Sequence, residues 1–182
     1  MEIILASNSP RRRELLSSRG VTFKVVPSDF NESEVFITSP KEYVKSLALN
    51  KALSVLKNNP LSVVIGADTV VVFNGQILGK PESEEQARKM LESLSNNEHE
   101  VITGYAVISK DKKIIDCEVT KVIFNELSSE FISSYVLSGS PMDKAGAYGI
   151  QDGGLAKEIF GDYDNVVGLP TEKIIKALTE FI

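Results

Sequence analysis

The chain has 182 residues, 42% of them hydrophobic, which is enough for one compact domain or for two small lobes. Its formal net charge of −5 argues against a nucleic-acid-binding protein, which would normally carry a basic face, whereas a small anionic ligand needs only a local positive pocket. A single cysteine and a single histidine exclude an internal disulfide and leave no basis for a zinc site.

The N-terminus lacks the features that mark a signal peptide. It enters a strand-like segment directly, without a charged start and a long apolar core. No apolar run approaches the length that spans a bilayer. We therefore predict a soluble, cytoplasmic protein with no membrane partner.

The pattern of apolar residues predicts a chain in which strands and helices alternate. Strands are expected at 2–7, 22–26, 61–73, 99–110 and 112–124. Helices are expected at 39–59, with Ser39 as its cap, at 83–94 and 128–137, after Ser9, and from Pro170 onward. The acidic segment 28–34 is a predicted loop, and a glycine-rich region extends to Gly168. Because hairpin turns at 74–75 and 111–113 are mixed with the helices, the predicted fold class is α/β, with a mixed twisted sheet and flanking helices.

Three consecutive arginines, 11–13, stand where a helix begins. Ser9 is the expected N-cap and Pro10 the first helical residue, so the arginines lie beside the positive end of the helix dipole. Each cation in that place is unfavourable by about 0.3–1 kcal/mol. A bound anion would supply the missing counter-charge, and the alternative is a solvated basic turn that pairs with surface acids.

The helical period predicts which arginines point inward. At about 100° per residue, Arg12 shares the face of Leu15 and Leu16, Arg11 lies at its edge, and Arg13 points away. Two inward guanidinium groups beside free backbone N–H groups suit phosphate oxygens. Removing their charge should weaken substrate use and leave the stability unchanged or slightly raised.

Asp68 interrupts a run of β-branched residues, where a carboxylate needs a partner. If the following Asn-Gly pair forms a two-residue loop, the ladder places Thr69 opposite Lys80 and makes Lys80 a diagonal neighbour of Asp68. Strict alternation sends the two side chains to opposite faces, so a bulge at Gly66 or a position at the sheet edge is needed to bring them together. The alternative is a structural ion pair at a strand end.

Other candidate residues carry weaker signals. Glu32 lies in the acidic loop, and carboxylates without histidine or cysteine are typical ligands of Mg²⁺ or Mn²⁺, although acidic loops are usually only solvated. His99 is expected to be structural, because no nucleophile is evident beside it, and Tyr148 to fill the core. Segment 141–154 is rich in glycine, which allows close approach to a flat ligand, and it includes the amide of Gln151.

Six motifs follow one another along nearly the whole chain: LASNSPRRRELL, GADTVV, GQILGKP, HEVITG, PMDKAGAYGIQ and GDYDNVVGLP. Together they resemble the Maf family of nucleoside triphosphate pyrophosphatases, and DKAGAYGIQ is similar to the branch that acts on dTTP and UTP. The resemblance implies a single Maf-like domain over residues 1–182, with two lobes around a deep cleft, related to the inosine triphosphate pyrophosphatases, and a homodimer.

The resemblance also implies roles for individual residues. Asp68 matches the catalytic acid of the family, and Arg11, Thr69 and Gln151 match positions tied to specificity. Further residues that match the lining of the cleft are Ser7, Arg12, Glu32, Lys51 and Lys80. We predict that Asp68, Lys80 and Glu32 act in catalysis and that Glu32 and Asp68 hold a divalent cation, Mg²⁺ or Mn²⁺.

The predicted reaction is hydrolysis of dTTP, UTP or a modified pyrimidine nucleotide to the monophosphate and pyrophosphate. Asp68 would act as the general base, and the metal would neutralise phosphate charge. The predicted partner is therefore a nucleoside triphosphate and not a nucleic acid. The alternative is a non-catalytic nucleotide-binding regulator of cell division, which would need the arginine turn but not a carboxylate among the cations.

Overall fold

The structure is a computed structural model that describes residues 1–36 and 39–181. Its strands are β1 (Ile3–Leu5), β2 (Lys24–Val25), β3 (Val63–Phe73), β4 (Gln76–Leu78), β5 (Glu98–Ile108), β6 (Lys113–Phe124) and β7 (Ala156–Phe160). Its α-helices are α1 (Pro10–Ser18), α2 (Pro40–Leu56), α3 (Glu84–Leu94), α4 (Ser129–Leu137), α5 (Tyr163–Val167) and α6 (Thr171–Leu178). Short 3₁₀ helices are η1 (Glu32–Glu34), η2 (Ser140–Asp143), η3 (Ala145–Ala147) and η4 (Ile150–Asp152).

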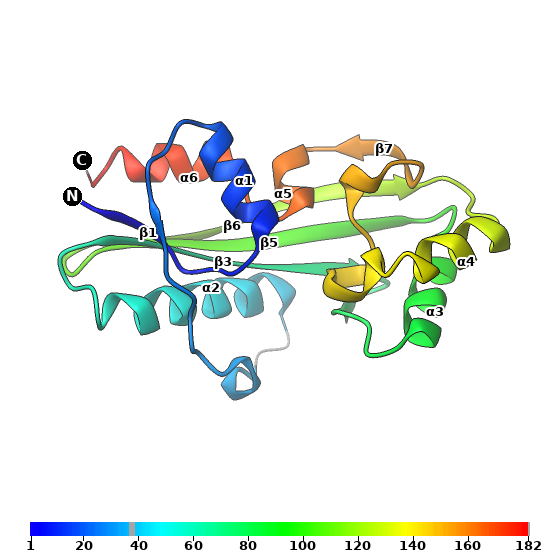
Figure 1. Cartoon of the computed structure of the whole chain (residues 1–182), viewed down its shortest axis with the longest axis horizontal. Helices are drawn as coiled ribbons and strands as arrows, with labels where there is room; N and C mark the ends of the chain where they lie inside the picture. Colours follow the sequence, from blue (N-terminus) through cyan, green and yellow to red (C-terminus); the bar gives the residue numbers. More distant parts are fainter. Residues whose placement is uncertain (37–38, 182) are drawn as a thin grey trace. The chain divides into compact units, whose positions relative to one another are not determined.

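The strands form one mixed sheet in the order β2-β1-β3-β5-β6-β7, with β4 paired to β3 (Figure 1). β1 pairs in parallel with β2 and β3, whereas β3 pairs with β4 and β6 pairs with β7 in the antiparallel sense. The predicted fold class, a mixed sheet with flanking helices, is confirmed.

Local sequence signals account for most element boundaries. Side chains cap α1, α3 and α4: the hydroxyls of Ser9, Ser83 and Ser128 each accept a hydrogen bond from the backbone N–H three residues later. Ser39 stands at the N-cap of α2, as predicted, but its side chain forms no capping hydrogen bond. The start of α2 depends instead on Pro40, whose ring fixes a helical φ and brings no unsatisfied N–H.

The Asn-Gly turn forms as predicted, but the ladder that follows it is short. Asn74 and Gly75 have φ angles of 49° and 76°, as a tight hairpin turn requires, and Phe73 pairs with Gln76. Pairing ends at Val71 and Leu78, so the expected pair of Thr69 with Lys80 does not form. Backbone pairing therefore gives Lys80 no fixed place beside Asp68.

Several short elements differ from the predicted secondary structure, above all in the glycine-rich region. The expected strand 22–26 is reduced to the two residues of β2, and η1 lies inside the expected acidic loop. The region before Gly168 contains η2, η3, η4, β7 and α5, none of which the sequence pattern predicted. These elements are too short to show a hydrophobic period.

The chain divides into two compact units. The first unit comprises Met1–Thr69, Thr103–Glu118 and Gly168–Ile182, and the second comprises Val70–Ile102 and Val119–Val167. Among the described residues, no helix combines the length and the apolar character needed to cross a lipid bilayer.

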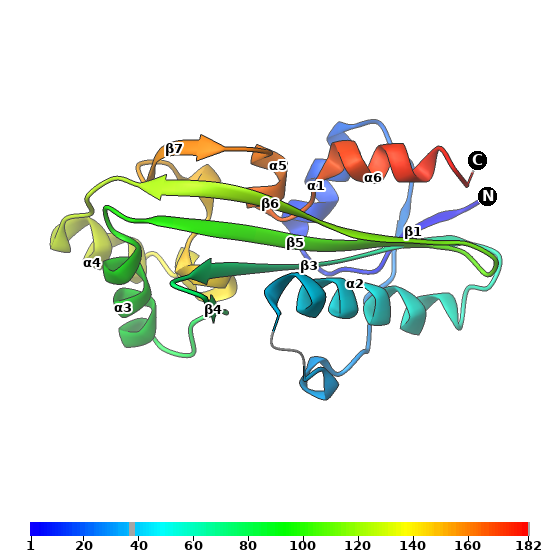
Figure 2. The same ribbon diagram turned by 180° about the vertical axis from the view of Figure 1, so that it is seen from behind.

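In the first unit, helices cover both faces of the sheet. α2 lies on one face, and α1 and α6 lie on the other (Figure 1 and Figure 2). The alternation of side chains along the strands produces this arrangement: Ile4 belongs to the core cluster that includes Ala52 of α2, whereas Leu5 belongs to the cluster that includes Leu16 of α1 and Ile174 of α6. All five side chains are fully buried.

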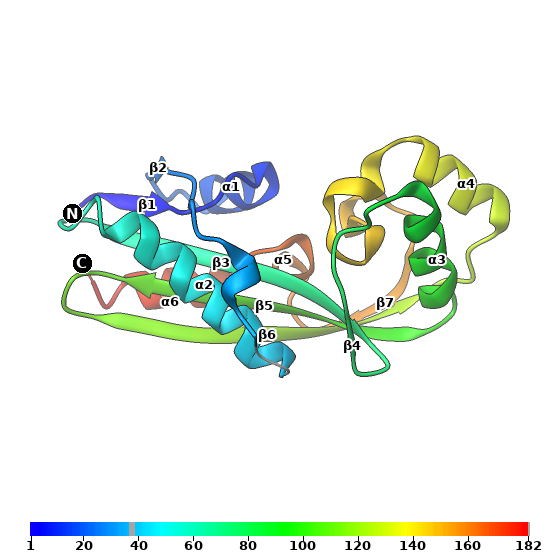
Figure 3. The same cartoon turned by 90° about the horizontal axis from the view of Figure 1, so that it is seen from below.

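In the second unit, α3 and α4 pack against each other and against the 3₁₀ turns of the glycine-rich region (Figure 3). Their core cluster includes Leu91, Val136 and Phe124. His99 lies in this core, where its Nε2 is 2.7 Å from the hydroxyl oxygen of Tyr148 and its ring contacts that of Phe124 edge to face. His99 and Tyr148 are thus core residues, as expected.

Burial of His99 predicts a pH-dependent stability. Desolvation lowers the pKa of His99 from 6.5 to about 4, so the unfolded chain binds this proton more readily than the folded one between those values. The contribution of His99 is fully present above pH 6.5 and is lost as the pH falls toward 4, by about 2 kcal/mol between pH 7 and pH 5. Chemical denaturation of wild type and His99→Gln at both pH values tests this, and an equal pH dependence in the variant would contradict it.

Candidate active site

The site in the first unit begins with an unusually close contact between α2 and β3. A Cβ atom at Gly66 of β3 would lie 2.2 Å from the carbonyl oxygen of Ala48 and 3.0 Å from the side chain of Ala52. Only glycine allows the helix to pack this near the strand. Gly66 thereby lets the next residues of α2 reach the side chains that follow it on β3.

Lys51 of α2 joins the two carboxylates that the sequence singled out. Its Nζ donates to Asp68 Oδ1 at 2.6 Å and lies 2.7 Å from Glu32 Oε1. The Asp68 and Lys51 side chains are 14% and 13% exposed, whereas that of Glu32 is 54% exposed. The ion partner of Asp68 within the first unit is therefore Lys51, which α2 supplies. The pairing with Lys80, a residue of the second unit, stays a prediction.

Arg12 reaches from α1 to the same strand. Its Nε donates to the carbonyl oxygen of Gly168 at 2.8 Å, and its Nη1 donates to that of Ala67 at 2.9 Å. Nη2 donates to Thr69 Oγ1 at 3.0 Å, and Nη1 makes a longer bond of 3.4 Å to Ser7 Oγ. Four of the five N–H groups of the guanidinium thus donate to protein atoms. Arg12 therefore links the segment before α1, strand β3 and the residue Gly168 within the first unit.

The orientation of the three arginines agrees with the helical phase. Arg11 and Arg12 are half-buried and Arg13 is exposed, while Leu16 is buried beneath them. The contacts of Arg12 nevertheless change what its removal should do. Its loss would leave carbonyl and hydroxyl oxygens without their donor, so we no longer expect an unchanged or raised stability.

Charges within the site act on one another. Burial lowers the pKa of the Arg12 guanidinium, while the nearby Asp68 opposes this shift. Arginine remains protonated all the same. Burial also raises the pKa of Tyr43 on α2, and the carboxylates of Asp68 and Glu32 raise it further. The site therefore joins two carboxylates with cations, and of the two carboxylates only Asp68 is largely shielded from water.

Sequence reasoning missed two residues of the site, Tyr43 and Thr103. Thr103 is fully buried, and its hydroxyl oxygen is 2.9 Å from that of Thr69. The Thr69 hydroxyl also accepts a hydrogen bond from Arg12. Its place inside the HEVITG motif was the available signal. Tyr43 carried no signal, because an aromatic residue on an amphipathic helix is normally a core residue.

Two predicted site residues belong to the second unit. Lys80 is exposed and follows β4, and Gln151 is exposed on η4. The amide nitrogen of Gln151 lies 3.1 Å from the position of a Cβ built on Gly149, so its side chain folds back over its own turn. Their roles remain predictions.

The donor set of the first unit suits a hard divalent cation. Asp68 and Glu32 each direct a carboxylate oxygen at the same position, which is occupied by the ammonium group of Lys51. Mg²⁺ is typically bound by one or two carboxylates together with substrate phosphates and water. Among residues 1–36 and 39–181, no group of three or more His, Cys, Asp or Glu side chains could hold a metal ion by itself. These two carboxylates therefore fit a cation that arrives with a phosphate ligand.

The fold is similar to that of two solved Ham1 proteins. The one from Coxiella burnetii is 18% identical, with a TM-score of 0.55 and coverage of 99% of both chains. The one from Staphylococcus aureus is 17% identical, with a TM-score of 0.53 and coverage of 100% of this chain and 99% of that one. The protein thus has the α/β architecture of the Ham1 proteins.

Sequence similarity shows the family. Residues 2–181 match the model of the family described as Maf-like protein, and the chain belongs to this family. Curated relatives from Bacillus cereus (strain AH820) and Bacillus thuringiensis subsp. konkukian (strain 97-27), each named dTTP/UTP pyrophosphatase, are 48% identical to it. Each alignment covers 99% of this chain and 95% of the relative. The resemblance seen in the motifs is confirmed.

Proposed function

We propose that the protein hydrolyses pyrimidine nucleoside triphosphates, dTTP and UTP first, to the monophosphate and pyrophosphate. The names of relatives that are 48% identical over nearly the whole chain support this activity. The observation that carries the proposal is the contact of one lysine, Lys51, whose side chain is 13% exposed, with two carboxylates 2.6 and 2.7 Å away. One of them, Asp68, lies on β3, the strand whose Thr69 hydroxyl accepts a hydrogen bond from Arg12. Modified pyrimidine nucleotides present the same phosphates and fall within the same proposal.

In the proposed reaction, water attacks the α-phosphorus. The water oxygen forms a bond to phosphorus while the bond to the oxygen that leaves with pyrophosphate breaks, and the electron pair departs on pyrophosphate. Asp68 takes a proton from the water, with Lys51 fixing its Oδ1 at 2.6 Å so that Oδ2 can serve as the base. Positive charge from Lys51, Arg11 and the remaining N–H of Arg12 stabilises the negative charge that gathers on the phosphate oxygens.

A divalent cation, Mg²⁺ or Mn²⁺, is part of the proposal. Asp68 and Glu32 would hold it together with the phosphates, and when bound it would neutralise phosphate charge. Lys80 is proposed as a further cation for the triphosphate.

One assay separates this activity from binding alone. We would measure pyrophosphate release from the common ribo- and deoxyribonucleoside triphosphates with Mg²⁺, with Mn²⁺ and with a chelator. The proposal expects turnover of dTTP and UTP that the chelator abolishes. Nucleotide binding without any turnover would instead support a regulatory protein.

The base is proposed to be read by Gln151. Its amide offers both a donor and an acceptor, and an edge of uracil or thymine presents an N–H beside acceptor oxygens. Cytosine replaces one of those oxygens with an amino donor, which leaves a polar group unpaired at a cost of about 1–3 kcal/mol. Purines are disfavoured further by their size.

Replacing Gln151 with alanine is therefore expected to reduce selectivity more than rate. The ratio of kcat/KM for UTP to that for CTP should fall by about tenfold, which corresponds to roughly 1.4 kcal/mol, while the best kcat changes less. Steady-state kinetics on all common triphosphates provide the measurement. Unchanged discrimination in the variant, or a wild type that prefers GTP, would remove Gln151 from this role.

A further inference from the structure

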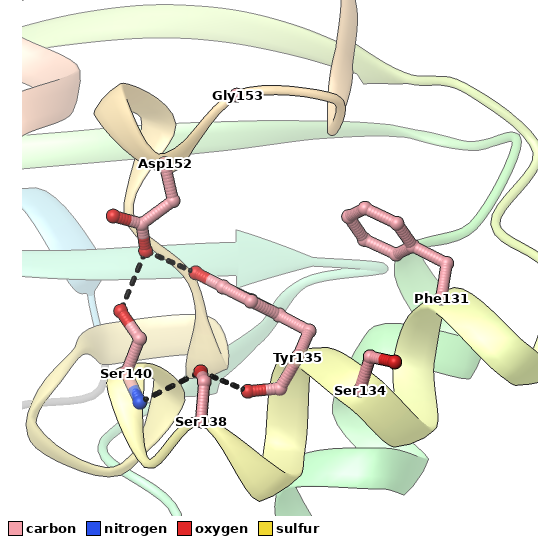
Figure 4. Close-up of a pocket in the computed structure, with 7 residues that line it drawn as sticks. All are labelled: Phe131, Ser134, Tyr135, Ser138, Ser140, Asp152 and Gly153. Atoms are coloured by element: carbon pink, nitrogen blue, oxygen red, sulfur yellow. Dashed lines mark hydrogen bonds between the residues drawn. The ribbon is translucent and has the colours of Figure 1, made fainter.

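The hydroxyl of Tyr135 bridges the two residues that enclose the turn of Gln151. It accepts a hydrogen bond from the backbone N–H of Gly149 at 2.9 Å. It also donates to Asp152 Oδ2 at 2.7 Å, a bond drawn in Figure 4. Residues 149 and 152 also close the turn directly, since the N–H of Asp152 donates to the carbonyl oxygen of Gly149 at 3.1 Å. One side chain of α4 therefore holds both ends of η4.

Two further polar side chains extend this network. Ser140 Oγ donates to the same Asp152 oxygen at 2.6 Å, and Lys144 Nζ donates to Ser140 Oγ at 3.1 Å and to its carbonyl oxygen at 2.6 Å. The Lys144 side chain is only 11% exposed. Its stem lies 2.8 Å from the position of a Cβ on Gly149, beside the amide of Gln151 at 3.1 Å. The Gly149 backbone is thus held by Tyr135, and the Gln151 amide occupies the space beside it that a Cβ would crowd.

Three residues of this network, Tyr135, Ser140 and Asp152, form part of the wall of a cavity of about 390 Å³. Phe131 and Tyr135 line it with stacked rings whose centroids are 5.9 Å apart. Figure 4 shows that the polar atoms of Tyr135, Ser140 and Asp152 point toward one another. Because these polar atoms form hydrogen bonds with one another, they stabilise the cavity wall and do not indicate a ligand site. Burial raises the pKa of the Tyr135 phenol, and its hydrogen bond to Asp152 raises it further, so the hydroxyl keeps its proton.

We propose that Tyr135 is a positioning residue that sets the specificity of base recognition by fixing the η4 turn under the Gln151 amide. This inference rests on the proposed function of Gln151 and assigns its orientation to a residue that does not contact substrate. Without the hydroxyl, Gly149 and Asp152 lose their common partner, and the amide samples orientations that no longer match one edge of a base.

The test is the variant Tyr135→Phe, which keeps the ring stacked on Phe131 and removes only the bridge. The ratio of kcat/KM for UTP to that for CTP should fall about threefold to tenfold, as expected for a lost hydrogen bond. The kcat for UTP should change less than twofold, because Asp68 and Lys51 belong to the other unit. Hydrogen exchange at the Gly149 amide should become faster.

Control variants separate positioning from general stability. Tyr163→Phe removes an exposed tyrosine hydroxyl from α5 of the same unit and should leave selectivity and exchange unchanged. Ser140→Ala removes another hydrogen-bond donor to Asp152 Oδ2 and should lower the selectivity in the same direction, by less than Tyr135→Phe. Should Tyr135→Phe fail to fold, Ser140→Ala carries the test alone.

The outcomes separate this inference from the proposed function. Intact selectivity and exchange in Tyr135→Phe, with selectivity lost in Gln151→Ala, would overturn the role of Tyr135 alone. An equal loss of kcat for every substrate, with the ratio kept, would make Tyr135 merely structural and would also overturn it. A wild type that releases no pyrophosphate from UTP would overturn the proposed function and, with it, the specificity role of Tyr135, whatever the exchange result.

Discussion

Replacing Asp68 with asparagine is expected to lower kcat for UTP by about 10²–10⁴-fold, the usual loss when a general base is removed. The fold should persist, because the asparagine oxygen can still accept the hydrogen bond that Lys51 Nζ now donates at 2.6 Å. Steady-state rates of pyrophosphate release, with far-ultraviolet circular dichroism as a check of folding, provide the measurement.

A matched control is Asp111→Asn, which removes an exposed carboxylate from the turn between β5 and β6. It should retain wild-type kinetics. Near-normal turnover in a folded Asp68→Asn protein would refute the proposed mechanism, because among the described residues the only other carboxylate in contact with Lys51 is that of Glu32, which is 54% exposed.

Replacing Arg12 with alanine should reduce both stability and activity. The carbonyl oxygens of Ala67 and Gly168 and the hydroxyl of Thr69 would lose their donor, which should lower the free energy of unfolding by about 1–3 kcal/mol. The β3 residues on either side of Asp68 would also lose the hydrogen bonds that fix them. A misplaced catalytic group typically costs about 10²-fold in kcat/KM. Urea denaturation and steady-state kinetics measure the two effects.

Two comparisons make the Arg12 result specific. Arg12→Lys keeps the charge but cannot reproduce the planar fork, so it should restore little of either property. Arg13→Ala removes a neighbouring exposed arginine and should leave both nearly unchanged. If Arg13 proved the more sensitive position, the assignment of the inward face of α1 would be wrong.

Much of the secondary structure could be read from short segments. The serine caps of α1, α3 and α4 and the Asn-Gly turn after β3 depend on contacts between residues that are close in the chain. Such contacts form wherever the segment occurs, so local patterns predict them. The elements near Gly168 were missed because their few residues acquire structure only by packing on the second-unit core.

The sequence by itself determined the mixed α/β class, the family, and the candidates Asp68, Glu32 and Arg12, since each rests on residue type and order along the chain. Only the tertiary structure decided how they are partnered. Lys51 contacts Asp68, 17 positions further along the chain, because Gly66 allows α2 to pack close to β3. Arg12 donates to the carbonyl oxygen of Gly168, 156 positions away. The local pattern contains no information on such pairs, because a long-range contact depends on how whole elements pack and not on the residues beside it.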